Sequence, residues 1–170
     1  MLEFKFPDGS HIEYIGISPD NGLSVSKKVP WYEEVWKIIK ASSNPNVLTH
    51  NFGMTTINII EQYPSMSSDS TSWVRYGAFG SIIIVINGRA KRVYVSERGQ
   101  MEPDHISNQS EAVKHKVQEI CERIGHGITL DYLCKDEYQY LRAIFNLYSL
   151  DEWRRNFKCE YCSTVKQELW

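Results

Sequence analysis

The first half of the chain alternates short apolar runs with helical patterns, and only short connections separate them. Residues 12–18 form an apolar run that ends at a turn, and residues 47–49 and 65–68 form two further short β-like runs. A helical pattern lies in each interval between the runs. The resulting order, β-α-β-α-β with short connections, favours a parallel sheet with right-handed crossovers. We therefore predict an α/β fold for this half.

Two helices are predicted between these runs. Pro30 marks the start of the first, because proline is favoured at the first position of a helix. Apolar side chains then recur at helical spacing on one face, at Trp31, Val35, Ile38 and Ile39. Thr55 or Thr56 caps the second helix, which carries Ile57 and Ile60 on one side.

The pattern changes in the second half of the chain. Two β-rich runs, 81–86 and 92–95, flank Asn87-Gly88, which is the strongest short signal for a β-hairpin. Two amphipathic helical patterns follow, and Gly125 closes the first of them. Their apolar residues are Val113, Val117, Ile120, Cys121 and Ile124 in the first, and Leu141, Ile144, Phe145 and Tyr148 in the second.

The length of 170 residues fits one domain with a sizeable core. No linker divides the chain, so we predict a single domain over 1–170, with a β/α unit at 1–80 and a hairpin plus helical extension at 81–170. The net charge of −2 does not mark a polyanion-binding surface.

The chain carries no sign of a membrane segment or a leader. The longest apolar run, at 82–86, is far shorter than the ~20 residues that a transmembrane helix needs. The first residues lack the basic and apolar regions of a signal peptide. We expect a cytoplasmic protein without a membrane partner, whose four cysteines are reduced thiols.

Asp69 follows the third β-like run and is the candidate catalytic residue, as a nucleophile or a general base. Catalytic groups collect beyond the carboxyl ends of parallel strands. The hydroxyls that follow can hold a carboxylate in one rotamer, and Trp73 and Arg75 offer a stacking face and a fixed positive charge. The candidate substrate-binding residues here are Ser70, Thr71, Trp73 and Arg75. The alternative is a structural role for Asp69, as a helix N-cap or an Asx-turn residue.

A second polar loop follows the second β-like run and contains three candidate substrate-binding residues, His50, Asn51 and Gly53. Gly53 indicates close approach of the backbone to a ligand, because a residue without Cβ leaves that room. Asn51 supplies an amide donor and acceptor, and His50 directly precedes it in the sequence.

Cys159 and Cys162 form a C-x-x-C pair near the end of the chain. A tetrahedral zinc site needs two more ligands, and the other cysteines and histidines follow no familiar spacing. We interpret the pair as structural thiols and expect no metal or other cofactor, with zinc as the alternative.

The succession YIGIS, helix, LTHNFG, helix, SSDSTSW resembles the last three strands of the tRNA-guanine transglycosylase barrel. It is most similar to the phage and bacterial relatives linked to 7-deazaguanine modification of DNA. The resemblance covers about residues 10–85. It implies a partial TIM-barrel-like unit in which Asp69 is the nucleophile that attacks C1′ of the target nucleoside. It also implies that His50 and Arg75 lie near ribose and phosphate, and that Trp73 or Tyr76 stacks on the base.

The chain departs from that family in length and in detail. A full barrel needs eight strands and about 250 residues, and the general-base aspartate of the family belongs to the missing half. Ser18 stands where the tRNA enzymes carry a glycine. A half barrel exposes sheet edges, so we expect a second chain, or self-association, to complete it.

Three functions follow from these observations. The first is base exchange on DNA or tRNA by a transferase, in the host-cell cytoplasm if the chain is phage-encoded. The second is a non-catalytic module that binds a nucleobase, a nucleic acid or another protein. The third is a small α/β protein of another kind, in which the similarity is incidental.

Overall fold

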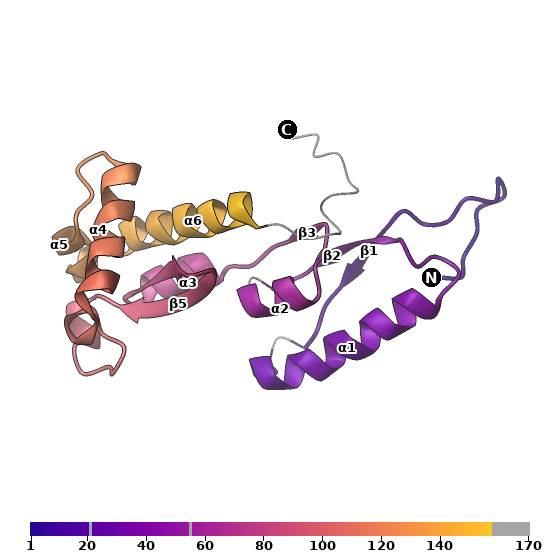
Figure 1. The fold of residues 1–170 in the computed structure, drawn as a ribbon, viewed down its shortest axis with the longest axis horizontal. Coiled ribbons are helices and arrows are strands. Elements are labelled where there is room, and N and C mark those ends of the chain that lie inside the picture. The colour runs from indigo at the N-terminus through magenta and orange to yellow at the C-terminus, as the bar shows by residue number, and fades with distance from the viewer. Residues whose placement is uncertain (21, 55, 158–170) are drawn as a thin grey trace. The chain divides into compact units, whose positions relative to one another are not determined.

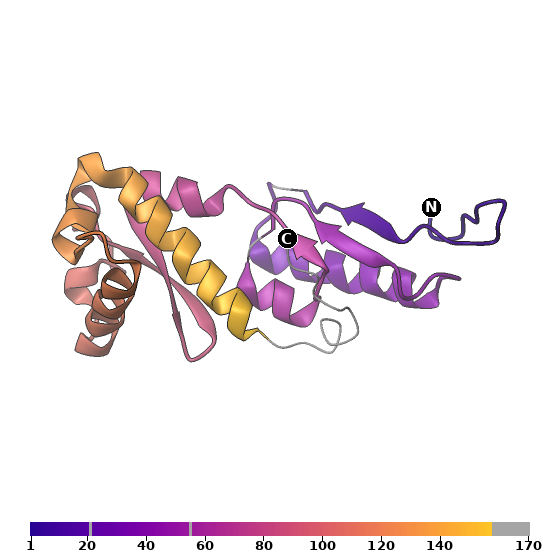
Figure 2. The same cartoon turned by 90° about the horizontal axis from the view of Figure 1, so that it is seen from above.

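The computed structural model describes residues 1–20, 22–54 and 56–157 (Figures 1 and 2). These residues form two compact units, Met1–Ser70 and Thr71–Phe157, each with its own hydrophobic core. The boundary between the units falls after Ser70, one residue beyond Asp69. That the chain acts as one domain stays a prediction.

The first unit contains a parallel three-stranded sheet in the order β1-β2-β3. Its strands are β1 (Tyr14–Ile17), β2 (Leu48–Asn51) and β3 (Ser67–Ser68). Helices α1 (Val25–Ala41) and α2 (Ile57–Gln62) connect them in turn. The predicted β-α-β-α-β order and the parallel sheet are therefore confirmed.

Both helices lie on one side of this sheet (Figure 1). Ile15 and Ile17 of β1 point to that side and pack in one cluster with Tyr32 of α1 and Ile59 of α2. Because successive side chains of a strand point to opposite faces, the residues between them form the other face. That face carries polar and exposed residues, namely Tyr14, Gly16, His50 and Ser67.

Helix α1 differs from its prediction in two ways. It begins at Val25, so Pro30 lies inside it and does not open it. A proline there removes one backbone hydrogen bond, but the extra turn packs Val29 against the core of the first unit. Ile38, predicted to be buried, is exposed, and Tyr32 is buried in its place.

The hydroxyl of Tyr32 is buried and has no hydrogen-bond partner among the described residues. We expect Tyr32→Phe to raise the free energy of unfolding at pH 7 by about 1 kcal/mol, because it removes a polar group that folding desolvates. Burial raises the pKa of Tyr32 to about 12. In the unfolded chain a tyrosine ionises near pH ~10, so ionisation favours the unfolded state and wild-type stability falls between these two values.

Urea denaturation at pH 7 and pH 11 checks this prediction. The difference in the free energy of unfolding between the phenylalanine variant and the wild type should be larger at pH 11 than at pH 7. Tyr140→Phe, at an exposed position, is the control and should leave the free energy of unfolding unchanged at both pH values. A Tyr32→Phe variant less stable than the wild type at pH 7 would contradict the prediction.

The second unit combines an antiparallel hairpin with helices. The hairpin consists of β4 (Ser81–Ile86) and β5 (Arg89–Tyr94). Its turn is the predicted Asn87-Gly88, with positive φ at both residues as a type I′ turn requires. The helices are α3 (Ser72–Ala78), α4 (Glu111–Ile124), α5 (Leu130–Cys134) and α6 (Gln139–Asn156), with short 3₁₀ turns at Glu97–Gly99, Ile106–Asn108 and Asp136–Tyr138.

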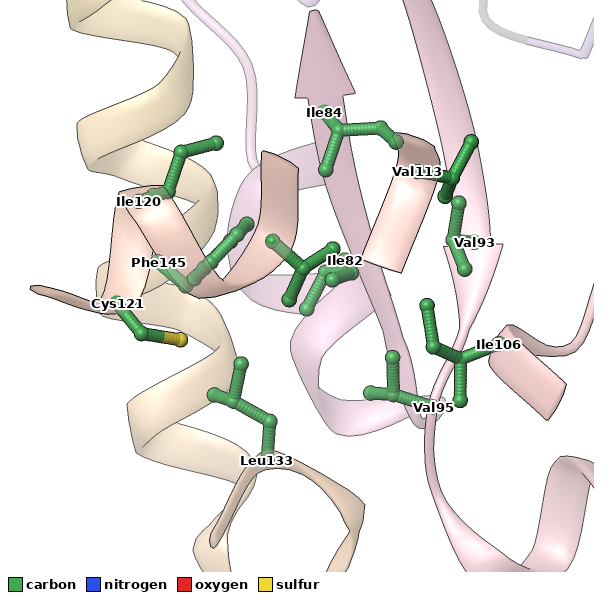
Figure 3. Close-up of a cluster of buried hydrophobic side chains, with 11 residues drawn as sticks. Ile82, Ile84, Val93, Val95, Ile106, Val113, Ile120, Cys121, Leu133 and Phe145 are labelled. Atoms are coloured by element: carbon green, nitrogen blue, oxygen red, sulfur yellow. The ribbon is translucent and has the colours of Figure 1, made fainter. Parts of the chain in front are cut away.

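The core of the second unit joins the hairpin to α4, α5 and α6. Figure 3 shows Ile82 and Ile84 of β4, Ile120 of α4 and Phe145 of α6 in this cluster. Helix α4 ends before Gly125, as predicted, and its predicted apolar face is confirmed in the buried residues Val113, Val117, Ile120 and Cys121.

The buried face of α6 differs from the predicted one. Ile144 and Tyr148 are exposed, whereas Arg142 and Asn146 are buried beside Phe145. Asn146 accepts a hydrogen bond from the Ile83 N–H at 2.6 Å and donates to the carbonyl of Trp73 at 2.9 Å. Apolar periodicity missed this face because its polar side chains are satisfied by backbone groups of other elements.

The five strands of the described residues form one parallel and one antiparallel sheet, and no closed barrel. None of the helices in the described part of the chain has the length and apolar character that crossing a bilayer requires.

Candidate functional site

Asp69 lies directly after β3, at the carboxyl end of the parallel sheet. Its backbone N–H donates to the carbonyl of Asn51 at 3.1 Å. Its carboxylate Oδ1 accepts a hydrogen bond of 2.8 Å from the backbone N–H of Gly53, in the loop after β2. The side chain is 63% exposed. The carboxylate is thus fixed across two loops and remains open to a ligand. The N-cap position of α3 belongs to Thr71.

His50 lies on the exposed face of the sheet, beside this carboxylate. Its Nε2 is 3.7 Å from Asp69 Oδ1, and its Nδ1 is 2.6 Å from Ser67 Oγ on the neighbouring strand. The hydroxyl of Tyr14 contacts the same Ser67 Oγ. Tyr14, Ser67, His50 and Asp69 therefore form a continuous line of polar contacts across all three strands. These two contacts hold the His50 ring in one orientation beside the carboxylate.

Phe52 lies beside His50 on the same side of the sheet. Its ring meets the His50 ring edge-on, with 4.4 Å between the ring centroids. It also covers Gly16 of β1, because a Cβ built on Gly16 would lie 2.4 Å from Phe52 Cε2. Gly16 thus provides the space that the ring occupies.

Asn51 faces the opposite way from His50. Its side chain is fully buried, and its amide donates to Ser65 Oγ at 2.8 Å. It belongs to β2 and not to a loop after it, because the strand extends to residue 51. In this position Asn51 connects β2 to the segment before β3.

The remaining candidates follow Asp69 in the chain. Ser70 is half-buried and directly adjacent to it. The others belong to the second unit, where Thr71 is the N-cap of α3, Trp73 is half-buried and Arg75 is exposed in the last turn of that helix. Among the predicted site residues, the structure brings His50 and Gly53 into contact with Asp69.

Tyr14, Ser67 and Phe52 complete the candidate site and were not predicted from the sequence. Strand periodicity contains part of the signal, because Tyr14 and Gly16 alternate with the buried Ile15 and Ile17. The pairing of Gly16 with His50 and of His50 with Ser67 depends on strand register, which the sequence did not specify.

Cys159 and Cys162 lie outside the described residues, so both zinc and a structural role for this pair stay predictions. In the described ranges no three His, Cys, Asp or Glu side chains gather as a metal site would require. Cys121 and Cys134 are free thiols. Burial raises the pKa of both, that of Cys121 to about 11, which disfavours the thiolate that binds metals.

Protein-family models, curated proteins and solved structures were each compared with the chain, and none matches it.

Proposed function

We propose that this chain carries the nucleophile of a transglycosylase-type base exchange on nucleic acid. The observation that supports this most directly is the Asp69 carboxylate, which is exposed, held by the Gly53 N–H and placed at the carboxyl end of a parallel strand. An aspartate with these properties suits nucleophilic attack on a sugar carbon. The replaced base is guanine and the inserted base a 7-deazaguanine, as the sequence resemblance implies.

The reaction consists of two displacements at C1′ of the target nucleoside. A carboxylate oxygen of Asp69 forms a bond to C1′ while the glycosidic C–N bond breaks, and the leaving base keeps the electron pair on its nitrogen and takes a proton from water. The incoming base then attacks C1′ through its nitrogen and gives its N–H proton to water, and its attack releases the carboxylate. One difficult substitution is thereby divided into two easier ones. His50 lies next to the reacting carboxylate and is suited to contact the ribose.

The sheet of the first unit is compatible with three consecutive units of a larger barrel. Its strands follow in sequential order, and the apolar side chains of β1 lie on the helix-covered face. Its opposite face carries His50 and Ser67 near the carboxyl ends of β2 and β3, the end at which a barrel carries its functional groups. Parallel sheets are normally covered on both faces. A second chain, or a second copy, that supplies further strands is therefore part of the proposal.

Exchange of labelled guanine tests this function. The full chain is incubated with tRNA, with single-stranded DNA and with duplex DNA. Each incubation is done without and with a candidate second chain that supplies the missing strands. The proposal expects label in at least one nucleic acid. The absence of label from all of them, with a positive control enzyme active in the same buffer, would overturn it.

A non-catalytic nucleobase-binding module is the second candidate. The observation that favours it is the polar face of the sheet, on which the rings of Tyr14 and Phe52 both contact the ring of His50. Under this function the chain binds a nucleobase or nucleic acid with the affinity of the wild type even when Asp69 is replaced, and no exchange occurs.

A further inference from the structure

Phe52 has an unusual place for an aromatic side chain. It is 50% exposed, although the first unit has an apolar core on the other side of the sheet. Exposed large apolar side chains are common on protein surfaces and need no explanation singly. Phe52 differs from such residues because its ring is seated on the backbone of a neighbouring strand.

The seat is Gly16. A side chain of any size at this position would meet the Phe52 ring, since even a Cβ would lie 2.4 Å from Cε2. Gly16 is paired with His50 in the sheet, and its extended neighbours Ile15 and Ile17 are typical strand residues. A glycine in the middle of a strand weakens the strand. In exchange for a weaker strand, Gly16 leaves the space that the Phe52 ring occupies.

His50 fixes the ring from the side. The two rings meet at an interplanar angle of 73° with 4.4 Å between centroids, an edge-to-face arrangement that is favourable for aromatic pairs. His50 is itself held by Ser67 Oγ. Phe52 is therefore an exposed ring whose position is set on two sides, which is the property of a stacking platform and not of a loose surface residue.

The platform adjoins the proposed nucleophile. Phe52 is followed directly by Gly53, whose N–H donates to Asp69 Oδ1. In a nucleoside the base is bonded to C1′, the carbon that Asp69 would attack. A base on the Phe52 ring would thus have its sugar next to the carboxylate.

From this geometry we infer that Phe52 stacks on the nucleobase of the target nucleotide and that Gly16 is required for it. The inference rests on the proposed function and deepens it, since it places a base-stacking residue in the same unit as Asp69. The ligand class is an unstacked nucleobase, either in a single-stranded oligonucleotide or free in solution. Stacking on one aromatic side chain contributes about 1–3 kcal/mol per base.

Binding of a fluorescently labelled guanine-containing single-stranded oligonucleotide to the full chain tests the inference. Phe52→Ala should weaken binding roughly 5- to 150-fold, which is the stacking energy converted to affinity. Gly16→Val should weaken it similarly because it displaces the ring, and Phe52→Trp should keep it. Phe79→Ala is the matched control, because Phe79 is also an exposed phenylalanine but belongs to the second unit. Circular dichroism verifies that each variant is folded.

Competition with free guanine and with guanosine separates the two sources of the base. Displacement by guanine means that the base alone is recognised, and displacement only by guanosine or an oligonucleotide means that the sugar is required. Both results support stacking if Phe52→Ala reduces the binding. Wild-type affinity in a folded Phe52→Ala variant, or a wild type that binds none of these ligands, would overturn the inference.

The same measurement separates failure of this inference from failure of the proposed function. If Phe52→Ala weakens binding while no exchange is detected with any nucleic acid, stacking holds and the transglycosylase proposal fails. If exchange occurs and Phe52→Ala binds as the wild type does, the transglycosylase proposal holds and the stacking inference fails.

Discussion

Replacement of Asp69 by asparagine is expected to reduce base exchange by roughly 10⁴-fold or more, as removal of a covalent nucleophile does in other enzymes. The amide has nearly the shape of the carboxylate and keeps an oxygen that can accept the Gly53 N–H bond, which is 2.8 Å in the wild type. It lacks the negative charge that attacks C1′. The side chain is largely exposed, so we expect the fold to be unchanged. Label transfer measured in a single turnover checks the prediction.

The chain contains a well-matched control for this variant. Asp20 is also an exposed aspartate, and its Oδ1 also accepts a glycine N–H, from Gly22 at 2.8 Å. Asp20→Asn removes the same charge and perturbs the same kind of hydrogen bond at a turn. It should exchange bases at the wild-type rate. Wild-type activity in Asp69→Asn would remove Asp69 from the mechanism, and an equal loss in both variants would indicate a general effect of charge or folding.

Replacement of Arg142 by methionine is expected to destabilise the second unit by about 3–5 kcal/mol. Arg142 is 1% exposed. Its guanidinium donates to four backbone carbonyls, those of Gly77, Leu133, Lys135 and Asp136, at 2.7–3.2 Å. Burial lowers the pKa of Arg142, but the group remains cationic because a guanidinium is not deprotonated in proteins. Methionine fills a similar volume without a donor and leaves these carbonyls unsatisfied.

Amide hydrogen exchange measures this loss in each unit separately. Protection should fall in β4 and α6 and remain unchanged in β2, which belongs to the first unit. Arg154→Met is the control, since Arg154 lies on the same helix but forms an exposed pair with Asp151. Such pairs contribute less than about 1 kcal/mol. Equal protection in Arg142→Met and the wild type would show that the guanidinium does not hold these segments together.

Local patterns predicted those elements in which backbone preference and apolar spacing match the positions that the residues take in the fold. The Asn87-Gly88 turn was predictable because few residues other than Asn and Gly adopt two successive positive φ values. The α4 face was predictable because its buried positions are apolar at helical spacing. Pro30 and the α6 face were mispredicted, since contacts with other elements outweighed the local preference there.

The candidate site was predicted only in part, because local patterns reveal some of its residues and not others. Asp69, His50 and Gly53 stand out as polar or small residues near strand ends, and the structure brings them into contact. Phe52 and Ser67 do not stand out, because an aromatic residue is ordinary in a loop and a serine is ordinary in a short strand. Their importance depends on what lies across the sheet from them, namely Gly16 and His50.

The sequence by itself determined the order of strands and helices in the first unit, the hairpin turn and the position of Asp69 after a strand. These follow from spacing and from backbone preferences, which act over a few residues. Only the tertiary structure decided which face of the sheet the helices cover, the register that lines up Gly16, His50 and Ser67, and the burial of Arg142. Those features are set by hydrogen bonds and packing between residues far apart in the chain, which no local pattern contains.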